Sequence, residues 1–139
     1  VGVKRDRDLT RTILIELADE PLPNKGFMFF ADASHDEEKR EYHIDLLIEA
    51  GLARIKSQTV NQLGAGGTVY MGRRVLRHLT VSITSAGHDY LEAIRDEGIW
   101  SKTKAAVAET GGSATLEIVK SLALGFLKSK IEKHTGLIL

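Results

Sequence analysis

The middle of the chain carries side chains suited to binding anions. No acidic residue lies between Glu49 and Asp89, although the 19 basic and 19 acidic side chains of the whole sequence balance. Lys and Arg side chains are the groups that neutralise nucleic-acid phosphates. This acid-free stretch therefore predicts contacts with a phosphate backbone, made by five cations: Arg54, Lys56, Arg73, Arg74 and Arg77.

Other polar residues extend the predicted interface. Lys39, Arg40 and His43 fall in a helix expected just before the basic stretch. Gln58 and Asn61 have amide side chains of the kind that read base edges. The first predicted helix and its approach offer further contacts with the backbone of a nucleic acid, through Lys4, Arg5, Arg7 and Arg11.

The acidic side chains of the predicted helix that contains His43 argue against contacts between this helix and DNA. Phosphates repel carboxylates, so we expect the basic hairpin to lead any contact. Acids in a first helical turn also have a local explanation, because they interact favourably with the positive end of the helix dipole. Two bases, Lys39 and Arg40, stand in this helix against six acids: Asp36, Glu37, Glu38, Glu41, Asp45 and Glu49.

The sequence contains no recognisable catalytic pattern. Five scattered histidines show no metal-binding spacing, and the chain has no cysteine to supply thiolate ligands or a thiol nucleophile. The glycines at 64–67 lack the Lys-Ser/Thr pair of a phosphate-binding loop. We therefore predict a protein that is not an enzyme and has no metal or cofactor.

Length and hydropathy suggest a small cytoplasmic protein. A chain of 139 residues suits one domain, or a compact module with an appended helical part. No apolar run approaches the roughly 20 residues that span a bilayer. The absence of cysteine is compatible with a reducing compartment.

Periodicity predicts alternating helices and strands. Apolar residues at helical spacing indicate helices over 6–20, 35–50, 85–97, 99–110 and 115–134. Ser34 and Glu37 have the spacing of a capping box, and Gly51 suits the end of the second helix. Strand patterns occupy 27–31, 53–60, 68–71 and 75–83, with a glycine-rich turn at 61–67.

This order of elements predicts an α+β fold of the winged helix-turn-helix type. A long β-hairpin would form the wing, and the domain would span 4–98, followed by a C-terminal helical extension at 99–139. Two segments support the interpretation: His43 to Leu52, which ends in Ala-Gly-Leu, resembles the end of a recognition helix, and Ile83 to Leu91 resembles the passage from a wing strand into the next helix.

Further motifs resemble a bacterial and phage family known as domain of unknown function 2513. They are Lys4 to Leu9, Glu41-Tyr42-His43, Ala50-Gly51-Leu52, Leu79-Thr80, Gly87 to Leu91, Asp96, Ile99 to Lys104 and Gly111-Gly112. The family has no established activity, so the resemblance implies a bacterial or phage setting for the protein but no mechanism. Arg40 departs from the pattern, which implies an apolar residue there, and the hairpin from Arg54 to Leu79 is long.

The sequence leaves two functions open. One is nucleic-acid binding, with double-stranded DNA as the partner and a regulatory role. The other is a protein–protein adaptor that does not bind DNA. The last amphipathic helix, with apolar residues from Leu116 to Ile131, suits either a homodimer contact or packing on its own domain.

Overall fold

The fold is described by a computed structural model covering residues 5–22, 24–61, 68–112 and 114–139. Contacts divide the chain into two compact units, Val1–Thr84 and Ser85–Leu139. This division falls before helix α3 (Ser85–Ile94), which packs with the helices that follow it. The predicted domain boundary between residues 98 and 99 stays a prediction.

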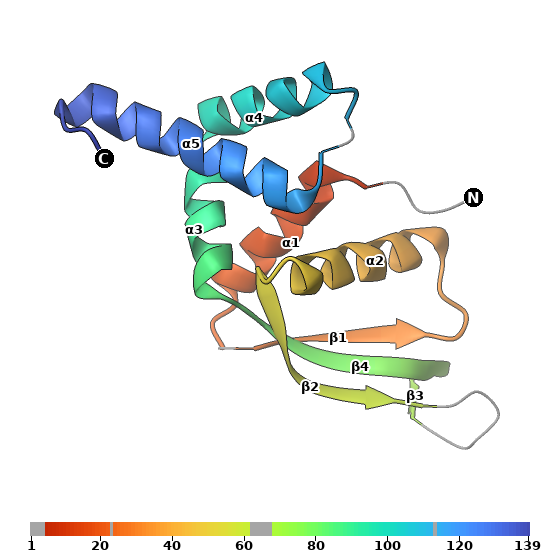
Figure 1. Cartoon of the computed structure of the whole chain (residues 1–139). Coiled ribbons are helices and arrows are strands. Elements are labelled where there is room, and N and C mark those ends of the chain that lie inside the picture. Colours follow the sequence, from red (N-terminus) through yellow and green to blue (C-terminus); the bar gives the residue numbers. More distant parts are fainter. Residues whose placement is uncertain (1–4, 23, 62–67, 113) are drawn as a thin grey trace. The chain divides into compact units, whose positions relative to one another are not determined.

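The first unit is built on an antiparallel sheet with strand order β1-β4-β2 (Figure 1). The strands are β1 (Lys25–Phe30), β2 (Ala53–Val60) and the long central β4 (Arg73–Ile83), while the short β3 (Val69–Tyr70) pairs with β4. In the register, Leu79 of β4 lies between Phe27 of β1 on one side and Gln58 of β2 on the other. The predicted turn at 61–67 lies mostly outside the described residues.

Two helices accompany this sheet. Helix α1 (Arg7–Asp19) begins at Asp6, whose side chain accepts a hydrogen bond from the Leu9 N–H. Helix α2 (His35–Glu49) begins with the predicted capping box, in which Ser34 and Glu37 satisfy each other's backbone N–H groups. Gly51 follows α2 with a φ of 75°, which explains the glycine at this position.

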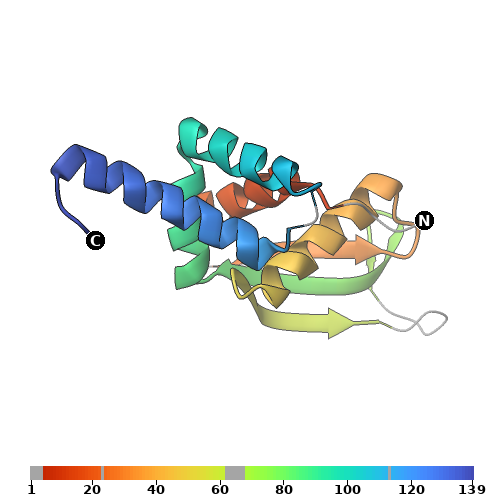
Figure 2. The ribbon, with the colours of Figure 1, turned by 45° about the horizontal axis from the view of Figure 1, so that its top comes forward.

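Helix α2 covers one face of the sheet, as the two views show (Figures 1 and 2). Helix α1 packs on α2 and on β4. The apolar stripes predicted from the sequence supply the core between these layers. Its buried members are Ile13, Leu14, Leu17, Phe27, Phe29, Ile44, Leu47, Leu52, Val75, Leu79 and Val81.

The predicted α+β class is confirmed, with five helices and a four-stranded antiparallel sheet in the described parts of the chain. The order of elements matches the prediction closely. In the described residues, strand β1 comes between α1 and α2 along the chain. In a helix-turn-helix, by contrast, the two helices follow each other directly and only a turn joins them.

The second unit contains α3, α4 (Glu97–Glu109) and α5 (Leu116–Thr135). Asp96 caps α4 and Thr115 caps α5, each by accepting a backbone N–H. Helices α4 and α5 pack side by side (Figure 2). The largest buried side chain of this unit is Trp100, which is 2% exposed and stands in the Ile-Trp-x-Lys-Thr-Lys motif.

A tight turn joins β3 to β4. Tyr70 pairs with Arg73, and the two residues between them, Met71 and Gly72, have φ angles of 50° and 78°. Two positive φ angles define the type I′ turn, in which Asn-Gly is a preferred pair. Met71 is 83% exposed, so its side chain gains no burial that would offset the cost of its left-handed backbone conformation.

We predict that Met71→Asn stabilises the protein by about 0.5–1 kcal/mol, because asparagine tolerates the left-handed conformation better than methionine. Urea unfolding monitored by circular dichroism measures the change. Met71→Ala serves as the control, since alanine lacks both the exposed apolar chain and the tolerance of asparagine. Equal stability of the two variants would contradict the assignment of strain to this residue.

Candidate nucleic-acid interface

Arg73 is held by two acids within the first unit. Its Nε donates to Asp32 at 3.0 Å. Its two terminal nitrogens donate to both oxygens of Glu37, at 3.0 and 3.1 Å. The guanidinium also lies 4.0 Å from the centre of the Phe30 ring. Arg73 is therefore fully engaged in contacts with its own fold.

Arg77 repeats this arrangement one step further along β4. It donates to both oxygens of Asp45 at 3.1 and 3.2 Å, and to Glu41 at 3.1 Å. Its Nε donates to the amide oxygen of Gln58 at 3.0 Å. Its side chain is only 20% exposed. We call Arg73 and Arg77 with their α2 partners Glu37, Glu41 and Asp45 the arginine ladder.

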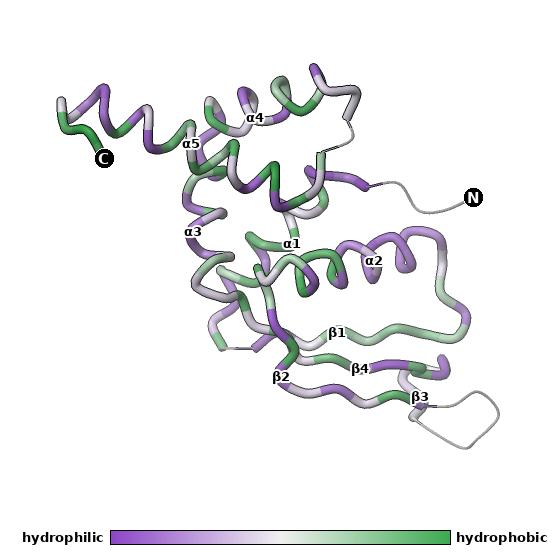
Figure 3. The backbone as a smooth tube through the Cα atoms, in the orientation of Figure 1, coloured by the Kyte–Doolittle hydropathy of each residue, from purple (hydrophilic) through white to green (hydrophobic). Residues whose placement is uncertain are grey.

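The ladder follows from two periodicities. Residues four apart lie on the same face of a strand, and residues four apart lie on the same side of a helix. Hence Arg73 and Arg77 both face α2, whose acids at positions 37, 41 and 45 face them. In Figure 3 the hydrophilic first turns of α2 stand over the hydrophilic end of β4.

The ion pairs shift the ionisation of their members. Hydrogen bonds from Arg73, and then from the Ser34 backbone, lower the pKa of Glu37 from 4.5 to about 2. Hydrogen bonds to Glu37, and then to Asp32, raise the pKa of Arg73. Burial acts against the charge of Arg77, but hydrogen bonds to Asp45 and Glu41 outweigh it and raise the pKa of Arg77.

The two bases of α2 are also paired. Lys39 Nζ lies 3.0 Å from Asp6, and hydrogen bonding to Lys39 lowers the pKa of that carboxyl. Arg40 forms an ion pair with Glu16 and lies 5.4 Å from the centre of the Phe27 ring. The charge at position 40, where the family resemblance implied an apolar residue, is thus accommodated by a carboxylate and an aromatic ring.

His43 is completely buried and so offers no surface to a ligand. Its Nε2 accepts the Asp6 N–H at 2.7 Å, and its Nδ1 lies 2.7 Å from the Lys39 carbonyl, to which it donates in that tautomer. Both ring nitrogens are satisfied. The expectation of a nucleic-acid contact at His43 is therefore corrected to that of a buried link between the start of α1 and α2.

The remaining predicted cations, Arg54, Lys56 and Arg74, are exposed and have no ion pair or side-chain hydrogen bond with the described residues. Arg74 lies between Arg73 and Val75, so its side chain belongs to the opposite face of β4. Arg54 is opposite Ser82 on that same face, and Lys56 falls where the register of β2 shifts.

We call this side of the sheet the outer face; it is exposed at Arg54, Arg74 and His78, whereas Ser82 on the same side is buried. Besides Arg54 and Arg74 it carries polar side chains capable of contacting phosphates, which the register places on the same side: Ser57, Thr59, His78 and Thr80. Ser57 and Thr80 share a hydrogen bond of 2.6 Å. No acid is present in this part of the sequence.

The structure thus separates the lysines and arginines of the predicted site into two groups. Arg73, Arg77, Lys39 and Arg40 are paired with acids, whereas Arg54, Lys56 and Arg74 remain unpaired among the described residues. Sequence reasoning missed the ladder, although the four-residue spacing of acids and arginines was visible. The signal lies in the match between the two spacings, whereas the charge balance along the chain does not contain it.

The other predicted contacts are dispersed. Gln58 accepts from Arg77, and the Asn61 amide donates to the Val75 carbonyl at 3.0 Å. Arg5 is exposed, Arg7 and Arg11 make interactions within the fold, and Lys4 lies outside the described residues. These residues therefore do not gather with the outer face into one described cluster.

The described residues hold neither a cluster of metal ligands nor a helix that could span a membrane. No group of three or more metal-ligating side chains comes together among these residues. None of the helices traced here has the length and apolar character needed to cross a bilayer.

These features define a small α+β protein with a helix-covered antiparallel sheet and a polar outer face. The chain belongs to the family described as "Hypothetical protein (DUF2513)", whose model matches residues 4–113. The match confirms the resemblance drawn from the motifs.

A distant relative agrees with this assignment. An uncharacterized protein of Haemophilus influenzae is 25% identical over 122 residues, which cover 87% of this chain and 92% of that protein. No solved structure shows significant similarity to the chain.

Two of the family motifs meet in the structure. The first contains Asp6 and the second contains His43, and these residues are joined by the partly buried hydrogen bond from the Asp6 N–H. Asp6 also caps α1 and pairs with Lys39. The geometry gives these motif residues a structural role, because their polar atoms bond to each other and to the helix ends.

The lowered pKa of Glu37 predicts how the ladder responds to pH. Since the folded-state pKa is about 2 and the ordinary value is 4.5, the stabilisation from Glu37 is fully present above pH 4.5. It is lost as the pH falls from 4.5 through 2. Glu37→Gln should lower the urea midpoint at pH 7, and the difference from the natural protein should vanish near pH 2.

Glu38→Gln provides the matched control, because Glu38 is exposed on the same turn and makes no side-chain bond to the described residues. Glutamine at position 37 retains an oxygen for the capping box, so the experiment removes the charge and one of the two hydrogen bonds from Arg73 without removing the cap. A midpoint difference for Glu37→Gln that persists unchanged at pH 2 would show that its charge does not stabilise the fold.

Proposed function

We propose that the protein binds nucleic acid, led by the outer face of its sheet. The observation that carries the proposal is the separation of cations across β4. Acids neutralise Arg73 and Arg77 on the covered face, whereas Arg54 and Arg74 are exposed on the other side of the sheet and Lys56 is exposed at the register shift of β2. Cations with neighbouring hydroxyl groups are the usual partners of backbone phosphates.

Helix α2 is a poor candidate for entering the major groove. Its only two bases, Lys39 and Arg40, are paired with Asp6 and Glu16. Its exposed side chains include three acids, Asp36, Glu38 and Glu49. Phosphates would repel this surface, so recognition of base sequence by α2 is not part of the proposal.

Under this proposal the first unit is a variant winged helix. The order β1-β4-β2, the helix α2 ending in Ala-Gly-Leu and the following β-hairpin support the comparison. The hairpin then acts as the wing, which typically lies along phosphates. The proposal also includes a cytoplasmic location and a bacterial or phage setting. It assigns the protein a binding role and no catalysis.

Binding to a short DNA duplex across a salt series tests the proposal. Three phosphate contacts predict a slope of about −3 for the logarithm of the association constant against the logarithm of salt concentration. The double variant Arg54→Gln with Arg74→Gln should flatten that slope by about 2. Fluorescence anisotropy between about 50 and 200 mM salt measures both values.

Lys128→Gln is the control for loss of a positive charge, since Lys128 is exposed on α5 and has no partner among the described residues. It should leave the slope unchanged. Binding that is independent of salt, or a slope that the double variant does not alter, would rule out contacts led by the outer face.

A protein–protein role through a homodimer is the second candidate function. Leu124, Leu127 and Ile131 share one side of α5, and all three retain exposed surface, with Ile131 at 38%. Apolar side chains in a stripe at helical spacing favour helix pairing. A second copy of the chain would cover this stripe with an identical one.

Sedimentation equilibrium tests this second function. If α5 mediates pairing, the natural protein should sediment as a dimer, and Ile131→Glu should shift it towards the monomer because a charge would be buried in the contact. Lys128→Gln again serves as the control on the same helix. A protein that is monomeric at all concentrations measured would exclude the homodimer.

A further inference from the structure

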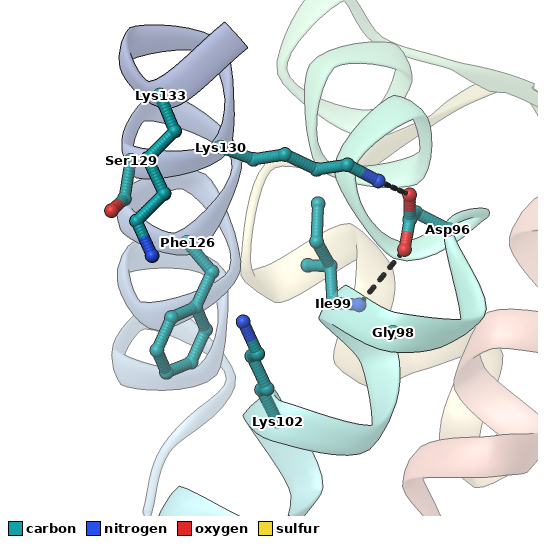
Figure 4. Close-up of a pocket in the computed structure, with 8 residues that line it drawn as sticks. All are labelled: Asp96, Gly98, Ile99, Lys102, Phe126, Ser129, Lys130 and Lys133. Atoms are coloured by element: carbon teal, nitrogen blue, oxygen red, sulfur yellow. Dashed lines mark hydrogen bonds and ion pairs between the residues drawn. The ribbon is translucent and has the colours of Figure 1, made fainter.

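A pocket of about 180 Å³ lies between α4 and α5 in the second unit (Figure 4). Its lining is unusual in charge, because three lysines face a single carboxylate. The residues are Asp96, Gly98, Ile99, Lys102, Phe126, Ser129, Lys130 and Lys133. None of these lining residues belongs to the outer face, whose residues all fall in the first unit.

The carboxylate is already committed. Asp96 caps α4 by accepting the Ile99 N–H at 3.0 Å, and it also forms an ion pair with Lys130. The hydrogen bond from Lys130, followed by that from Ile99, lowers the pKa of Asp96. Asp96 therefore neutralises Lys130 and fixes the start of α4.

Two positive charges then remain at the pocket. Lys102 and Lys133 have no hydrogen-bond or ion-pair partner among the described residues. In Figure 4 they extend from different helices, Lys102 from α4 and Lys133 from α5, and both ammonium groups approach the space beside the Phe126 ring. An anion placed there would contact two cations that the fold itself does not neutralise.

We propose that this pocket binds a phosphate monoester as its dianion. A monoester phosphate carries a charge of about −1.5 to −2 at pH 7, which matches the two unpaired ammonium groups. A phosphodiester carries only one charge per phosphate, so a monoester is the better match. The ring of Phe126 provides an apolar surface for the organic part of the ester.

Titration with phenyl phosphate, followed by NMR of the backbone amides, tests the proposal. Saturable shifts should centre on α4 near Lys102 and on α5 near Phe126. Inorganic phosphate should bind more weakly, because it lacks a ring to contact Phe126. Lys102→Gln and Lys133→Gln should each weaken phenyl phosphate binding about fivefold.

Three comparisons make the result decisive. Lys128→Gln, which removes a lysine of α5 outside the pocket, should leave the affinity unchanged. At pH 5, where the monoester is mostly a monoanion, binding should weaken. The Arg54→Gln and Arg74→Gln double variant should bind phenyl phosphate normally, which separates this site from the proposed nucleic-acid surface.

The absence of saturable shifts would overturn the proposal, as would an affinity that neither Lys102→Gln nor Lys133→Gln reduces. Circular dichroism of each variant checks that the helices remain folded. Because both lysines are exposed and have no partner in the part of the chain that the structure describes, their replacement by glutamine should leave unfolding unchanged.

Discussion

Helix α2 lies on the sheet with its acids against the two arginines that β4 directs towards it, and the position of the helix depends on this pairing. A guanidinium covered by a helix needs carboxylate partners, since an unpaired charge removed from water destabilises the fold. Arg73 and Arg77 each find a carboxylate that accepts two hydrogen bonds. These pairs stay partly exposed, so each contributes modestly to stability. Their main consequence is register, because a shift of α2 by one or two residues would turn these acids away from both arginines.

The same constraint explains the acidic composition of α2. Glu37 serves both the capping box and Arg73, while Glu41 and Asp45 share Arg77. Acids that seemed to weaken a nucleic-acid surface are thus components of the packing between helix and sheet. The proposed nucleic-acid surface is correspondingly limited to the predicted cations that the acids of α2 do not pair with, namely Arg54, Lys56 and Arg74.

Local patterns were sufficient to predict most of the fold. The capping box at Ser34, the glycine after α2 and strand β2 follow from short-range rules, and the structure contains all three. The pairing of Arg77 with Asp45 joins residues 32 positions apart, and charge composition alone cannot reveal such a contact. His43 shows the same limit, because its burial depends on the N–H of Asp6, a group of the backbone that the sequence pattern does not display.

Alternation along β4 finally determines which cations can act on a partner. Successive side chains of a strand point to opposite faces, so Arg73 and Arg74 have different surroundings although they are neighbours in sequence. Arg73 is enclosed by Asp32, Glu37 and the Phe30 ring, whereas Arg74 is exposed. A shift of one residue in the pairing of β4 would exchange these surroundings and place Arg74 against the acids. The ladder and the outer face are therefore two results of one register, and the cations left for function are those that packing does not require.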